Sequence, residues 1–135
     1  MSSRLVATAA FSVSTFFAVG TSAETQSEIR AIIGDIDLVE ASLFTANRAF
    51  YQMICPPYDY EHLATLVSRL EYGSLTSEER GRYEAILTSQ SKGNLALKEQ
   101  IETEAQERDI CRSLKIEIGE YIIAFRERYP GLLER

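Results

Sequence analysis

The residues of this chain with the most definite chemistry are its two cysteines, Cys55 and Cys111. In an oxidising compartment an even cysteine count favours a structural disulfide, and two cysteines allow one intramolecular pairing. A bridge between two chains and a pair of buried thiols are the alternatives. The sequence has no Cys-x-x-Cys motif, which excludes a thioredoxin-type redox site and haem attachment through Cys-x-x-Cys-His. We expect Cys55 and Cys111 to form a stabilising disulfide.

The single histidine, His62, restricts the metal and cofactor chemistry that the chain can carry. A His-rich zinc site and the paired Glu-x-x-His motifs of di-iron bundles both need more than one histidine. Asp59 precedes His62 by three residues, and we interpret the pair as the capped first turn of a helix with an exposed histidine. Met53 and His62 could serve as haem ligands, but no second signature supports this, and we assign Met53 to the core. We expect neither a metal nor another cofactor.

Motifs for nucleophilic catalysis and for phosphate binding are missing from the sequence. It has no Gly-x-Ser-x-Gly and no phosphate-cradling Gly-rich loop. A pair of carboxylates acting as acid and base stays open, because any two of the 20 acids might meet. We interpret the protein as a non-enzyme, and a close, buried pair of acids would speak against that interpretation.

Three tyrosines form the first candidate surface for binding a partner protein. Tyr51, Tyr58 and Tyr60 surround the rigid turn at Pro56 and Pro57. Tyrosine is enriched where protein interfaces are anchored. The alternative is that these rings cover one end of the helices with their hydroxyls in water.

The acidic segment 99–109 is the second candidate surface. Glu102, Glu104 and Glu107 stand out in it and suggest a protein partner with a basic surface, because complementary charge speeds encounter. The alternative is an ordinary solvated helix face or a kink. The net charge of −6 repels phosphate backbones, so we expect no binding of nucleic acid.

The first 23 residues have the pattern of a secretory signal peptide. Arg4 precedes an apolar run over 5–19, and the small residues at 21–23 suit cleavage after Ala23. An uncleaved anchor or a buried helix is the alternative, but the run is shorter than the roughly 20 residues that span a bilayer. We therefore expect one domain over 24–135, without a stable membrane anchor, in a bacterial periplasm or otherwise secreted.

Helical periodicity dominates the remaining sequence. A helix is predicted over 27–54, because apolar residues recur every seven positions and again three positions after each of these. This apolar seam consists of Ile29, Ile32, Ile36, Val39, Leu43, Ala46, Phe50 and Met53. Further helices are predicted over 59–72, from a Thr76–Glu79 capping box to a break at Gly93 and Asn94, and over 95–129. A helix that continues through Gly93 and Asn94 is the alternative to this break. We expect an all-helical fold, a small four-helix bundle with one disulfide.

The missing catalytic motifs, the acidic charge and the tyrosine-rich turn favour an exported helical protein that acts by protein–protein binding. An inhibitor, an immunity factor, an adaptor or a secreted effector would fit this description. The alternative is a chaperone-like or small-ligand or lipid-binding bundle in the periplasm. In that case apolar residues such as Ile116, Ile122, Ile123 and Phe125 would line a cleft or become exposed on stress.

Overall fold

The computed structural model describes residues 23–134, and side chains from residue 26 onward. Most of the predicted signal peptide, residues 1–22, lies outside this part of the chain. The described part is all-helical. Its elements are α1 (Ala23–Ile33), α2 (Leu38–Ile54), α3 (Glu61–Gly73), α4 (Ser77–Gln100), α5 (Glu104–Arg128) and the short 3-10 helix η1 (Leu132–Glu134).

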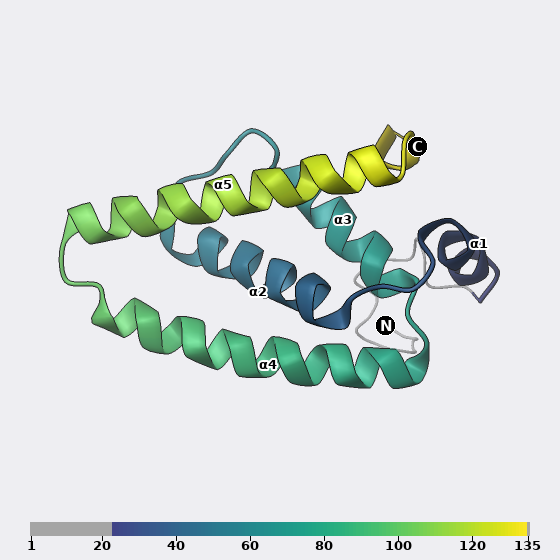
Figure 1. Ribbon diagram of the computed structural model, residues 1–135. Coiled ribbons are helices and arrows are strands. Elements are labelled where there is room, and N and C mark those ends of the chain that lie inside the picture. The colour runs from purple at the N-terminus through teal and green to yellow at the C-terminus, as the bar shows by residue number, and fades with distance from the viewer. Residues whose placement is uncertain (1–22, 135) are drawn as a thin grey trace, which may run out of the picture.

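The helix α2 lies between α4 and α5 and contacts both (Figure 1). The helix α3 runs beside α2 and α5, while α1 packs against α3 at the end of the molecule where the C-terminus also lies. The turn between α4 and α5 lies at the opposite end. The main core forms where α2, α3 and α5 meet, and its largest buried side chains include Phe44, Phe50, Ile118, Ile122 and Phe125.

The residues from 23 to 134 form five α-helices instead of the predicted four, because the helix expected over 27–54 is broken. Gly34 has a φ of 73°, which ends α1 in the left-handed conformation that glycine adopts without steric cost. Asp37 then caps α2, and its Oδ1 accepts hydrogen bonds from the backbone N–H groups of Val39 and Glu40 at 3.0 and 3.2 Å. The prediction of one continuous helix was therefore wrong.

The break also divides the apolar seam. Ile32, Val39 and Met53 are 40%, 52% and 51% exposed, so the assignment of Met53 to the core was wrong. Since α2 lies between two neighbouring helices, it buries residues on two sides, such as Ala41 and Phe44, and not a single heptad stripe.

The second half of the fold is a long helical hairpin whose turn lies later than predicted. The helix α4 continues through Gly93 and Asn94, and the Asn94 side-chain amide donates to the Ala46 carbonyl at 3.5 Å. The chain turns at 101–103, where Thr103 and Gln106 form a capping box that begins α5. The predicted Thr76–Glu79 capping box at the start of α4 is confirmed.

The predicted disulfide is confirmed. Cys55, at the end of α2, is joined to Cys111 on α5, with Sγ atoms 2.07 Å and Cα atoms 5.7 Å apart. The N-cap residue of the next helix, α3, is Tyr60, so the prediction that Asp59 caps this helix was wrong. The Tyr60 side chain makes no capping hydrogen bond. His62 lies exposed in the first turn of α3.

Candidate functional site

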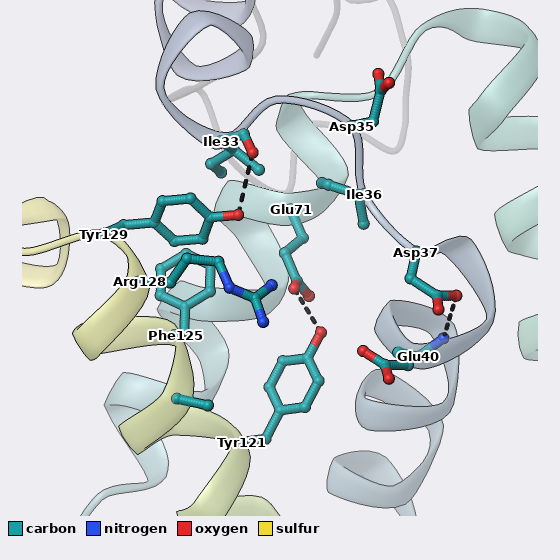
Figure 2. A pocket seen from close by; sticks show the side chains of 11 residues that line it. Ile33, Asp35, Ile36, Asp37, Glu40, Glu71, Tyr121, Phe125, Arg128 and Tyr129 are labelled. Carbon is teal, nitrogen blue, oxygen red and sulfur yellow. Dashed lines mark hydrogen bonds between the residues drawn. The ribbon is translucent and has the colours of Figure 1, made fainter.

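A small acidic pocket lies where the linker between α1 and α2 meets the ends of α3 and α5 (Figure 2). Its volume is about 100 Å³. Aromatic side chains from α5 and the residue after it form one wall. Four acids line it against one base: Asp35, Asp37, Glu40 and Glu71, with Arg128. The pocket is thus negatively charged and is sized for a side chain, because drug-sized ligands occupy about 300–1,000 Å³.

Glu71 is the central residue of the pocket. It is 5% exposed, and it is the only buried acid among the side chains at 26–134. Its Oε2 accepts a hydrogen bond from the Tyr121 hydroxyl at 2.6 Å, whereas its Oε1 is buried without a partner. A buried oxygen that lacks a partner costs free energy, about 1–3 kcal/mol. An oxygen of this kind inside a pocket is suited to accept a bond from a bound group.

The environment of Glu71 keeps its carboxyl group from ionising easily. Its pKa is raised from 4.5 to about 7, mainly by burial, and the negative charge of Glu40 acts in the same direction. The hydrogen bond from Tyr121 and the positive charge of Arg128 act in the opposite direction. The proton on Glu71 can therefore be exchanged near neutral pH.

The aromatic wall of the pocket is held rigidly. The Tyr121 ring stacks on Phe44 with centroids 4.2 Å apart and an angle of 13°. The Tyr129 hydroxyl donates to the Ile33 carbonyl at 3.0 Å, which ties the end of α5 to the end of α1 (Figure 2). Burial raises the pKa of Tyr121, so this hydroxyl remains a donor to Glu71.

The acids around Glu71 have different surroundings. Asp35 pairs with Arg30 at 2.9 Å but remains exposed, and Asp37 is occupied with the cap of α2. Glu40 is exposed at the rim. Within residues 23–134, no three or more acidic, cysteine or histidine side chains are grouped so that they could hold a metal ion. The arrangement is suited to bind an organic cation, with carboxylates for its charge and aromatic rings beside it.

Sequence reasoning did not select Glu71, although a signal was present. Ala64, Val67, Ser68 and Glu71 follow one another at spacings of three, one and three residues and form the buried face of α3. An acid at a position that continues a buried helical face is unusual, because ionised side chains are almost never fully buried without a partner.

The structure places two of the three tyrosines that were predicted to bind a partner in the core. Tyr51 and Tyr58 are 4% and 7% exposed, and the ring of Tyr58 meets those of Tyr51 and Tyr60 edge to face at 4.7 and 4.6 Å. The Tyr60 hydroxyl donates to the Lys115 carbonyl at 2.7 Å. The rings therefore pack the Pro56–Pro57 turn against α5, and Tyr51 and Tyr58 offer little surface to a partner.

The predicted acidic surface lies in the open. Glu102, Glu104 and Glu107 are all exposed in the turn between α4 and α5 and at the start of α5, at the end of the molecule opposite the C-terminus (Figure 1). The four apolar residues of the predicted cleft are separated. Ile116 and Ile123 are 53% and 55% exposed on the outer face of α5, whereas Ile122 and Phe125 are buried, so they do not line a common cleft.

No family model, curated protein or solved structure matches this chain. None of the helices in residues 23–134 combines the length and the apolar character needed to cross a membrane. The function must therefore be inferred from the geometry of the chain itself.

Proposed function

We propose that this protein is exported and acts by binding another protein that has a basic surface. One lysine or arginine side chain of the partner enters the acidic pocket and pairs with Glu71. The observation that carries the proposal is the Oε1 of Glu71, which is buried without a partner in a pocket lined by three further acids. The mature chain is the helical domain over 24–135, with α2–α5 as a four-helix bundle, in a bacterial periplasm or otherwise secreted.

Charge supports a cationic side chain as the bound group. Asp37, Glu40 and Glu71 face Arg128, while Asp35 is already paired with Arg30. A cation that approaches Glu71 stabilises its ionised form, because an opposite charge favours the charged state of an acid. Binding therefore releases a proton, and it should be stronger at pH 8 than at pH 6.

Binding fits the site better than catalysis does. Acid–base catalysis by carboxylates needs two acids held in different environments close to one another. In the described part of the chain Glu71 has no second buried acid beside it, and Glu40 is exposed.

The turn between α4 and α5 supports a second contact area with the partner. Glu102, Glu104 and Glu107 are exposed there, and Leu95 and Leu97, near the end of α4, are 47% and 39% exposed. Exposed acids beside exposed apolar groups suit an interface in which apolar contacts give affinity and charges give orientation.

The direct test uses n-butylammonium, which imitates a lysine side chain, and 1-butanol as its neutral counterpart. NMR spectra of the full chain would follow Glu71 and Tyr121 during each titration. We expect butylammonium to shift both signals, and more strongly at pH 8, with little effect of butanol. Glu71→Gln should abolish the response. Glu117→Gln, which removes an exposed acid from the outer side of α5, should leave it unchanged. Equal responses to the two compounds would refute the pocket as a cation site.

The protein-level test compares partners recovered from the native compartment. Variants with Glu71→Gln, or with Glu102, Glu104 and Glu107 all changed to lysine, should each recover less of the partner. Undiminished recovery by both variants would contradict the proposed surfaces.

Intact-mass measurement of exported protein tests the location: an N-terminus at Glu24 is expected, and a chain that still begins at Met1 would contradict export.

A further inference from the structure

A second, larger pocket lies between α2, α3 and α4. Its volume is about 390 Å³, within the range of small-molecule sites. The helix α2 packs closely against α4, whereas α3 lies on another side of α2. A groove lined by all three helices therefore remains open. Its walls include the rings of Tyr72 and Tyr83 and the side chain of Leu87. The site shares none of its lining residues with the acidic pocket.

Two arginines line this pocket, and Arg48 is the one that indicates a bound ligand. Its Nε is buried and has no hydrogen-bond partner. Its only hydrogen bond within residues 26–134 runs from Nη1 to the Gln52 amide oxygen at 3.4 Å. None of the ion pairs in that part of the chain involves Arg48. The negative charge of Glu61 on α3 acts on Arg48 without forming an ion pair, and Glu61 accepts a hydrogen bond from the Gln52 amide at 2.6 Å.

Within the described side chains, the Arg48 guanidinium group has no ion-pair partner. Burial lowers the pKa of Arg48, which reports the cost of keeping its charge away from water. Arg48 as a whole is half-buried, so its charge is partly withdrawn from water with no carboxylate of the described part of the chain at ion-pairing distance, which costs free energy. Arg69 adds a second guanidinium group to the lining of the same pocket. One acid, Glu84, also lines the pocket, but it accepts a hydrogen bond from the Tyr72 hydroxyl.

Three hydroxyl groups that line the pocket are hydrogen-bonded to one another. The Thr45 hydroxyl donates to Ser68 at 3.0 Å and lies 2.6 Å from the Tyr83 hydroxyl. These bonds engage the hydroxyl groups of Thr45, Ser68 and Tyr83, whereas the buried Nε–H donor of Arg48 has no hydrogen-bond partner among the described residues.

We propose that this second pocket binds a small organic acid, whose carboxylate pairs with Arg48 and whose apolar body packs against Tyr72, Tyr83 and Leu87. A planar guanidinium group is well matched to a carboxylate, to which it can donate two parallel bonds. The pocket volume exceeds what a bare inorganic ion needs, and the aromatic and aliphatic walls favour a ligand with an apolar chain or ring.

The test compares octanoate with octanol and with inorganic phosphate, using the full disulfide-linked chain. Isothermal titration measures affinity, and the NMR signal of the Arg48 Nε–H group reports contact at the site. We expect octanoate to bind about tenfold or more tightly than octanol, because a hydrogen bond to a charged group is worth about 1.5–3 kcal/mol. We also expect octanoate to shift the Arg48 signal, and phosphate to bind weakly or not at all.

Two variants and a control define the site. Arg48→Met keeps the aliphatic stem and should weaken octanoate about tenfold, while octanol binding stays the same. Leu87→Trp fills the pocket and should block octanoate with Arg48 intact. Arg82→Met removes an exposed arginine from α4 and should have no effect. Equal binding of octanoate and octanol to the unaltered chain would overturn the proposal, even if Arg48→Met fails to fold. Phosphate binding as tight as octanoate would also overturn it.

Discussion

Replacing Glu71 by glutamine should make the protein more stable at alkaline pH and leave its stability almost unchanged in acid. The reason is the environment of the carboxyl group, which is 5% exposed and has a pKa of about 7 in place of 4.5. Folding therefore favours the protonated form. Stability that depends on this proton is complete below pH 4.5 and is lost as pH rises through 7.

The magnitude follows from the shift in pKa. A rise from 4.5 to about 7 corresponds to about 3 kcal/mol, because each pKa unit is worth about 1.4 kcal/mol. The unaltered chain should lose this much free energy of unfolding between pH 4.5 and 8 on account of Glu71. The glutamine variant has no proton to lose, so it should be the more stable chain at pH 8 by up to about 3 kcal/mol.

Urea denaturation at pH 5 and pH 8 measures the difference, and subtracting one chain from the other cancels the other titrating groups. Glu79, whose carboxylate is bonded by Arg30 and whose pKa is lowered to about 2, titrates below this window. Glu40→Gln is the matched control. This substitution removes a charge that raises the pKa of Glu71, so the pH at which stability falls should become lower. Loss of Arg128 or of the Tyr121 hydrogen bond would have the opposite effect, because both lower the pKa of Glu71. The reasoning is refuted if Glu71→Gln has the same pH dependence as the unaltered chain.

Three further variants test the elements that hold the fold and the pocket. Gly34→Ala should destabilise the protein by about 1–2 kcal/mol in urea denaturation, because a residue with a Cβ is strained at a φ of 73°; an unchanged midpoint would contradict the left-handed turn. Replacing Cys55 and Cys111 by serine should cost about 4 kcal/mol, since the bridge closes a loop with a sequence separation of 56. A loss below about 1 kcal/mol would mean that the bridge hardly restricts the unfolded chain. Tyr121→Phe should cost about 1–3 kcal/mol by leaving Glu71 Oε2 without its donor. NMR titration should also find the pKa of Glu71 higher than before, and a lower pKa would contradict the assigned bond.

Features that depend on neighbouring residues could be predicted from the sequence. The Thr76–Glu79 capping box is confirmed, because a cap is formed by groups within one helical turn. Applied further along, the same rule would also have found Thr103 and Gln106, and would have moved the hairpin turn from Gly93 to 101–103. Likewise, Gly34 followed by Asp37 has the pattern of a helix stop and a new cap, but the heptad repeat concealed it.

Whether the candidate site residues are buried or exposed depends on contacts between distant segments. Tyr58 is buried because it is enclosed by Tyr51 and Tyr60, and Tyr60 itself is held by Lys115, a contact that joins positions 55 residues apart. Met53 continues the heptad repeat but is half exposed. Periodicity shows which residues share a face of a helix, but it does not show which faces are covered.

By itself, the sequence determined an all-helical chain with one disulfide. Helical periodicity depends on residues that are close in the sequence, and two cysteines allow one intramolecular pairing. Export of the mature domain and its binding to a basic partner stay predictions. Only the tertiary structure decided that, within the described part of the chain, Glu71 Oε1 and Arg48 Nε are buried without a hydrogen-bond partner. The physical reason is that the cost of burying a charge is set by the side chains packed around it, and here those side chains come from separate helices.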